Sequence, residues 1–176
     1  NEQVRMLVWA WMWTWMMMLS CKCVWWTWPV RAVANPLQGL QEDLPWQRDF
    51  APHFSLPPTV ARMARHALSE LLNNVLEHSG GQHVAVSMRT TILHLQLLVS
   101  DDGCGVFEHV QQSFGISDPT MAMLELSKGK LTSAPDRHGG HGLFFTSRLA
   151  DVFDVHANHR AFQCRGWDHH SWHPTK

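Results

Sequence analysis

One amphipathic stripe constrains the fold of this 176-residue chain more than any other feature. Apolar residues recur at helical spacing after the Pro57-Pro58 pair, with polar residues between them. They are Val60, Met63, Ala64, Ala67, Leu68, Leu71, Leu72, Val75 and Leu76. The spacing predicts a helix whose first turn Thr59 can cap. One face of that helix has to be buried, so we expect it to cover a β-sheet.

Two polar residues stand on the other side of this predicted helix. Glu70 and Asn74 are four residues apart, so one helical turn brings their side chains together. A solvated helix surface would account for them. However, Asn73 and Asn74 each cost about 0.5 kcal/mol relative to alanine in a helix interior, which suggests a functional use. A carboxylate is a plausible base, and an amide oxygen is a suitable ligand for Mg²⁺.

The next segments alternate between apolar and polar residues. Residues 84–88 and 93–99 therefore predict two antiparallel strands. The second strand runs into residues 101–105, Asp-Asp-Gly-Cys-Gly. Gly103 and Gly105 allow a tight turn and a close backbone approach to a ligand. An ordinary Asp-Gly turn at a strand end is the alternative.

A glycine-rich turn opens a second predicted helix. Residues 139–143 are Gly-Gly-His-Gly-Leu, and the helix then runs to about Leu149. Free backbone N–H groups and the positive end of the helix dipole gather at such a start, which favours phosphate groups. Residues 151–156 and 161–167 predict a further strand and its hairpin partner.

The three motifs, in this order, resemble the N, G1 and G2 boxes of the GHKL superfamily of gyrase, heat-shock chaperone, histidine kinase and mismatch-repair ATPases. The resemblance covers roughly residues 58–157. It is closest to prokaryotic regulatory ATPases, namely anti-sigma-factor serine kinases and a transcription-regulator-like group with a STAS-like domain. Residues 124–132 and 144–148 are similar to the second group in particular.

The resemblance implies an α/β two-layer sandwich of the Bergerat type, with a mostly antiparallel sheet, helices on one face and an ATP lid. Glu70 would be the catalytic carboxylate that orients or deprotonates the attacking water or hydroxyl. Asn74 would hold Mg²⁺, and Asp101 would accept the adenine amino proton. The other implied nucleotide contacts are Asn73, Gly103, Gly105, Lys130, Gly140, His141, Gly142 and Leu143.

The segment between Phe107 and Arg137 corresponds to the lid, where Lys128 or Lys130 could reach a phosphate. A helical run is expected within residues 121–126. A solvated basic loop is the alternative for the two lysines. His141 replaces the acidic or amide residue that related regulators often carry.

The predicted function is Mg²⁺-dependent ATP binding by a regulatory domain. A serine/threonine protein kinase of the anti-sigma-factor type, or an ATP-gated regulator, is favoured, and a non-catalytic ATP-binding module of a transcription regulator is the alternative. A sensor histidine kinase is disfavoured because residues 36–57 are too short and proline-rich for the helix pair that carries its phosphorylated histidine. The expected partners are a nucleotide and a regulatory protein, with a homodimer as a further alternative.

The composition disfavours other classes of partner. With 14 basic and 15 acidic residues, the net charge of −1 provides no electrostatic footprint for DNA or for an acidic membrane. The four cysteines are too few and too scattered for a disulfide framework, which favours a cytoplasmic protein. The histidines near the C-terminus fit no closed zinc pattern.

The first 35 residues form an anomalous segment rich in Trp and Met. Its apolar run over residues 6–19 is shorter than the roughly 20 residues that a membrane helix needs. Alternating Trp residues between 9 and 15 favour a strand, although no partner is evident. A disordered or non-native segment and an interfacial membrane anchor are the alternatives. We divide the chain into this segment (1–35), a linker with a lead-in helix (36–57), the ATP-binding domain (58–167) and a tail (168–176).

Overall fold

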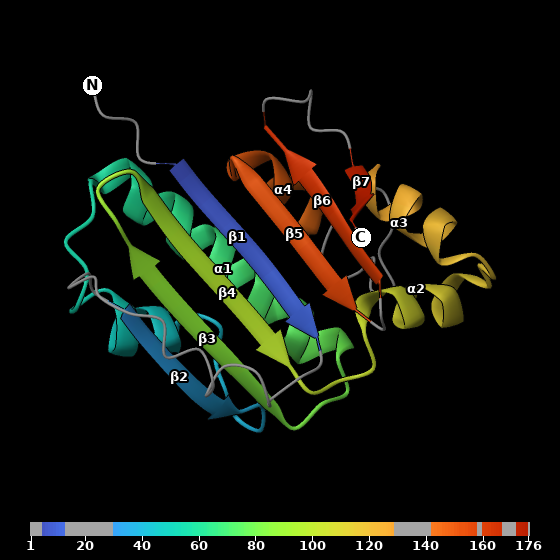
Figure 1. The fold of residues 1–176 in the computed structure, drawn as a ribbon. Helices are drawn as coiled ribbons and strands as arrows, with labels where there is room; N and C mark the ends of the chain where they lie inside the picture. Colours follow the sequence, from blue (N-terminus) through green and yellow to red (C-terminus); the bar gives the residue numbers. More distant parts are fainter. Residues whose placement is uncertain (1–4, 13–29, 129–141, 158–159, 167–171, 176) are drawn as a thin grey trace, which may run out of the picture.

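One mixed β-sheet is the frame of the molecule. The computed structural model describes residues 5–12, 30–128, 142–157, 160–166 and 172–175. Within these residues, the strands follow the order β2-β3-β4-β1-β5-β6-β7 (Figure 1). Their bounds are Arg5–Met12 (β1), Val30–Pro36 (β2), His83–Thr90 (β3), His94–Asp101 (β4), Val152–Ala157 (β5), Arg160–Arg165 (β6) and Trp172–Thr175 (β7).

The first strand of the chain lies in the interior of this sheet. β1 pairs in parallel with β4, where Arg5 lies opposite His94, and with β5, where Leu7 lies opposite Val152. The other four pairings among the described strands are antiparallel. The predicted mostly antiparallel sheet is therefore confirmed, with β1 joining its two antiparallel halves.

Burial and hydrogen bonds to Asp151 hold β1 in place. Met6 and Val8 are almost completely buried. The N–H of Met6 donates to the carboxylate of Asp151 at 2.7 Å, and the N–H of Asp151 donates back to the carbonyl of Met6 at 2.8 Å. The alternation of tryptophans in the sequence is compatible with this strand, which includes Trp9 and Trp11, while residues 13–29 lie outside the described residues.

A long helix, α1 (Pro58–His78), covers one face of the sheet (Figure 1). Its buried residues belong to the predicted stripe: Ala64, Ala67, Leu68, Leu71, Leu72 and Val75. They share one core with inward-facing strand residues such as Val86, Leu97 and Phe153. The helix begins at Pro58, where the missing N–H of proline costs no hydrogen bond. The expected cap by Thr59 is wrong, because the capping position is Pro57 and no side chain caps the helix.

The predicted hairpin of β3 and β4 is confirmed. Buried and partly exposed residues alternate along both strands. The expected start of the second strand at Leu93 is wrong, because Leu93 lies in the turn and is 54% exposed. The hydroxyl of Thr91 accepts hydrogen bonds from the N–H groups of Leu93 and His94, at 3.3 and 2.9 Å, which stabilises that turn.

Shorter helices complete the second layer. They are a single turn, η1 (Trp46–Phe50), and the helices α2 (Val106–Phe114), α3 (Pro119–Ser127) and α4 (Gly142–Leu149). α4 packs against α1, and α3 contacts both α2 and α4. α1 and α4 lie on the same face of the sheet (Figure 1). The predicted two-layer α/β sandwich, the helical run of the lid segment and the helix ending at Leu149 are confirmed.

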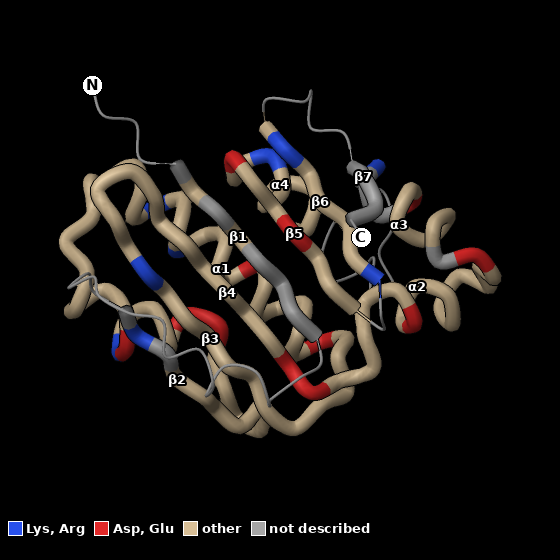
Figure 2. Tube along the Cα trace, viewed as in Figure 1, with Lys and Arg blue, Asp and Glu red and all other residues tan. Residues whose placement is uncertain are grey.

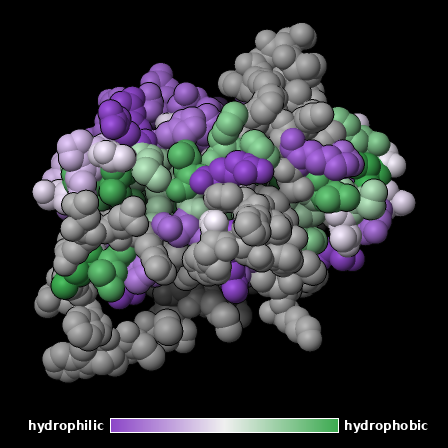
Figure 3. All heavy atoms as spheres, turned by 90° about the horizontal axis from the view of Figure 1, so that it is seen from above, coloured by the Kyte–Doolittle hydropathy of each residue, from purple (hydrophilic) through white to green (hydrophobic). Residues whose placement is uncertain are grey.

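The described surface mixes charged, polar and apolar residues. Figure 2 shows acidic and basic residues dispersed over strands and helices, without a long run of one sign. In Figure 3, the visible hydrophobic residues form separate groups among hydrophilic ones. The exposed large apolar residues are Leu44, Ile92, Leu93, Phe114, Met121, Leu124 and Phe145. No described helix is long and apolar enough to span a bilayer.

Candidate functional site

Asp101, the last residue of β4, is a buried carboxylate. It is 6% exposed, and its Oδ1 accepts a hydrogen bond from the N–H of Gly103 at 2.9 Å. Burial raises the pKa of Asp101 to about 6, an effect that the Gly103 N–H opposes and the nearby charge of Asp102 increases. A hydrogen-bond acceptor held out of water binds an N–H donor more strongly than an exposed one does.

The glycine turn after Asp101 is docked on the end of α1. A Cβ on Gly103 would collide with the carbonyl oxygen of Ser79, the residue that follows α1. The N–H of Cys104 donates to the same carbonyl at 2.9 Å. Gly105 has a φ of +95° directly before α2, a conformation that favours glycine. Both glycines of the motif therefore have structural reasons to be glycine, and the turn fixes Asp101 beside the end of α1.

The start of α4 lies against Glu70. A Cβ on Gly142, the first residue of α4, would fall on the Glu70 carboxylate. His66 lies one turn before Glu70, with its Nδ1 3.8 Å from Glu70 Oε1. His66 was not predicted as a site residue, although its spacing of four residues from Glu70 indicates such a contact. The predicted acid and the second glycine motif thus meet in the structure.

Asn74 lies one turn beyond Glu70 on α1. Its side chain is partly exposed, but its amide nitrogen is buried and has no hydrogen-bond partner among the described residues. A buried donor without a partner costs about 1–3 kcal/mol, so an amide kept here fits a contact with a ligand. Asn73, also partly exposed, is the neighbouring residue on α1.

Some of the other predicted nucleotide contacts are described by the structure and some are not. Leu143 is partly buried and packs against the core. Lys128 is exposed, and its ammonium group pairs with the carboxylate of Glu125 within the lid segment. The remaining predicted contacts, which lie outside the described residues, are Lys130, Gly140 and His141.

Two further contacts support this end of the molecule. Asp102 Oδ1 accepts hydrogen bonds from the N–H groups of Gln82 and His83, at 2.7 and 2.9 Å. The His83 N–H is the main cause that lowers the pKa of Asp102. The imidazole rings of His78, at the end of α1, and His109, on α2, lie 4.8 Å apart between centroids. These side chains fix the turns around Asp101, and their sequence gave no motif for this role.

The three sequence motifs therefore meet along α1. Glu70 contacts the start of α4, and Ser79 contacts the turn after Asp101. Ser79 follows Glu70 by nine positions along the chain, which corresponds to about 13.5 Å at the rise of a helix. A buried acceptor at one end and a helix start at the other can hold the base and the phosphates of one nucleotide.

Comparison with known families decides the class of the protein. The family model of the histidine kinase-like ATPase domain matches residues 42–164. The chain belongs to the histidine kinase-like ATPase family. The match extends from the lead-in segment before η1 to β6 and includes α1, β4 and the start of α4. Searches among curated proteins and among solved structures found no match.

Family membership confirms the resemblance to GHKL ATPases at this level and identifies an ATP-binding domain. In this histidine kinase-like ATPase, the contacts that bring the three motifs together all come from matched residues.

The burial of Asp101 predicts that the stability of this ATPase domain depends on pH. Because the folded-state pKa of Asp101 is about 6, above its ordinary 3.8, the folded state binds this proton more tightly. The resulting stabilisation is present below pH 3.8 and is lost as the pH rises through 6. Asp101→Asn removes the titration. We expect its stability relative to the parent to increase by about 2 kcal/mol between pH 4.5 and 7.5.

Urea unfolding of the parent and of Asp101→Asn at both pH values measures this difference. The other titrating groups are the same in both proteins, so their contributions to the unfolding free energy cancel in the difference. A difference in unfolding free energy that stays constant with pH would show that Asp101 is not held in a desolvated state.

Proposed function

We propose that this domain is a Mg²⁺-dependent protein kinase of the anti-sigma-factor type, in which Glu70 deprotonates a serine or threonine hydroxyl of a partner protein. The proposal rests mainly on the contact between the Glu70 carboxylate and Gly142 at the start of α4. Phosphate groups are favoured at a helix start. Glu70 would therefore stand beside the terminal phosphate of ATP, where an attacking hydroxyl must arrive.

The transfer step needs a base and little other covalent chemistry. Glu70 would take the hydroxyl proton while the hydroxyl oxygen forms its bond to the terminal phosphorus and the bond to the ADP oxygen breaks. His66, 3.8 Å from Glu70, would act as a positioning residue that keeps the carboxylate turned toward α4. The product is a phosphoserine or phosphothreonine, and the other product is ADP.

Asp101 and Asn74 would bind the two ends of the nucleotide. The buried Asp101 carboxylate would accept the adenine amino proton, which selects the base. The Asn74 amide would ligate Mg²⁺, which supplies charge neutralisation at the phosphates when bound. Within the described residues, no three His, Cys, Asp or Glu side chains are grouped to hold a metal ion. The amide oxygen of Asn74 would be the contact that α1 provides to the metal, and phosphate oxygens and waters would complete its ligands.

Replacement of Asn74 tests the metal assignment. We expect Asn74→Ala to weaken ATP binding about tenfold or more in Mg²⁺, since it removes an amide held for the metal site. In EDTA the parent and the variant should bind ATP equally weakly. Calorimetric titration under both conditions measures this, with Gln112→Ala, an exposed amide on α2, as the control. An equal loss of affinity in EDTA would contradict a role through the metal.

The type of phosphorylated product separates the candidate activities. Residues 30–57 form β2 and the single turn η1, rather than the helix pair that carries the phosphorylated histidine of a sensor kinase. We expect γ-labelled ATP to transfer label to a serine or threonine of a partner protein as an acid-stable phosphoester. Acid-labile label would indicate phosphohistidine instead. A complex that needs ATP, transfers no label and persists in Glu70→Ala would support the non-catalytic module.

A further inference from the structure

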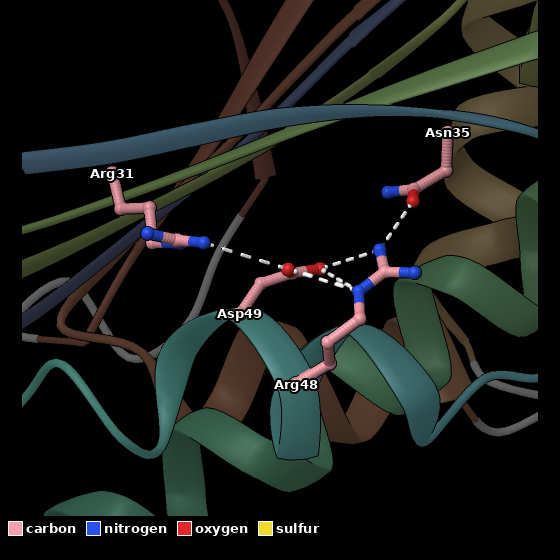
Figure 4. A network of polar contacts seen from close by, with 4 residues as sticks. All are labelled: Arg31, Asn35, Arg48 and Asp49. Carbon is pink, nitrogen blue, oxygen red and sulfur yellow. Dashed lines mark hydrogen bonds and ion pairs between the residues drawn. The ribbon is translucent and has the colours of Figure 1, made fainter.

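A polar network joins β2 to η1 (Figure 4). Arg31 and Asn35 come from β2, and Arg48 and Asp49 come from η1. Asp49 and Asn35 are 4% and 5% exposed. The guanidinium of Arg48 binds Asp49 with both arms of its fork, Nε at 3.0 Å and Nη2 at 2.7 Å. Nη2 of Arg48 also donates to Asn35 Oδ1 at 2.7 Å.

The network has more donors than acceptors. Nη2 of Arg31 approaches Asp49, at 3.7 Å from Oδ1, while the Nε of Arg31 is buried without a hydrogen-bond partner among the described residues. Within the same part of the chain, the amide nitrogen of Asn35 is also buried without a partner. In Figure 4 this nitrogen points to the side of the network on which Arg31 lies. Buried polar groups in folded proteins are almost always paired, so two unpaired donors require an acceptor from outside the network.

The charges of the network agree with this imbalance. Two guanidinium groups surround one carboxylate, and the hydrogen bonds from Arg48 keep the pKa of Asp49 below its ordinary value. Asp49 is therefore ionised at neutral pH, and the four residues carry one excess positive charge. The side chain of Arg31 is 38% exposed as a whole, although its Nε is buried. An ion would therefore reach Nε from the exposed part of this side chain.

We propose that Arg31 and Asn35 form a binding site for a small oxyanion, either a phosphate or a carboxylate group. Nε and Nη of one guanidinium form a parallel pair of donors that matches two oxygens of such a group. Asp49 already accepts from both donors of this pair on Arg48. On Arg31, Nη2 only approaches Asp49, at 3.7 Å, and Nε has no acceptor among the described residues. The amide of Asn35 adds a further donor from the same face of β2. The bound oxyanion would strengthen the attachment of η1 to β2.

Thermal unfolding of the full chain tests this site with sodium phosphate and sodium acetate, each against sodium chloride at equal ionic strength. A ligand that binds only the folded state raises the melting temperature. At ten times the Kd we expect a shift of about 3–5 °C. The shift should be lost in Arg31→Met. It should remain in Arg89→Met, which removes an exposed arginine from the neighbouring strand β3.

A shift with phosphate alone would identify a tetrahedral oxyanion, and one with acetate alone a carboxylate. Either result supports the site when Arg31→Met abolishes it. No shift with either salt, or an equal shift in the parent and in Arg31→Met, would overturn the proposal. If Arg31→Met does not fold, Arg31→Lys replaces it as the test variant. Lysine keeps the positive charge but lacks the paired donors of a guanidinium, so most of the rise in melting temperature should be lost. The site shares no residue with the nucleotide pocket, so ATP binding can fail or succeed independently.

Discussion

Replacement of Glu70 by Gln is expected to lower phosphoryl transfer by about 10²–10⁴-fold, the range that a positioned general base contributes. Glutamine has nearly the shape of glutamate, so it can keep the close packing against Gly142. It cannot accept the hydroxyl proton. ATP affinity should therefore change little, because the loss falls on the transition state rather than on nucleotide binding. Single-turnover transfer of label at saturating ATP measures the chemical step directly.

Glu42→Gln is the matched control for this variant. It makes the same chemical change at an exposed position before η1, and its transfer rate should equal that of the parent. Calorimetric ATP binding by Glu70→Gln separates a lost base from a damaged pocket. If Glu70→Gln transfers label at the parental rate, Glu70 is not the general base, even if the domain still binds ATP.

Asp101→Asn is expected to weaken ATP binding by about 10–100-fold. This is the change in affinity that corresponds to the loss of one hydrogen bond to a charged group. The carboxylate of Asp101 only accepts, and it suits the amino group of adenine. Inosine triphosphate has a carbonyl oxygen at that position, so the parent should reject it. The amide introduced by Asp101→Asn can donate to that oxygen. We therefore expect the preference for ATP over inosine triphosphate to shrink or reverse.

Competition between the two nucleotides for the parent and for Asp101→Asn measures this preference. Urea unfolding of Asp101→Asn at pH 7.5 shows directly whether the variant is folded, so a loss of binding can be separated from unfolding. If both proteins show the same ratio of affinities, Asp101 does not select the base. If neither nucleotide binds the folded parent, the proposed pocket fails as a whole.

Local patterns were sufficient to predict much of this fold. The stripe from Val60 to Leu76 became the buried face of α1, and alternation predicted β3 and β4. Both patterns depend on neighbours within one element, which a single sequence records. The residues of the candidate pocket were also chosen from short motifs. Their juxtaposition was not predictable in the same way, since Gly142 meets Glu70 across a large separation in the chain.

Other features depended on tertiary contacts that no local pattern carries. α2 was not predicted within the lid segment, where few of its residues are buried. The pairing of β1 was not predicted either, because its partners β4 and β5 come much later in the chain. His66 was missed because a histidine on a polar helix face is unremarkable until the position of the neighbouring acid is known.

The position of β1 also bears on how the protein is made. Of the described strands, β1 leaves the ribosome first, but its contact with Asp151 spans 145 residues. At about 5–20 residues per second, this strand waits roughly 7–30 s for its second neighbour. During that time the edge of β1 that later pairs with β5 can pair with other chains. We therefore expect nascent chains truncated before β5 to recruit chaperones, and synthesis speed to influence the yield of soluble protein.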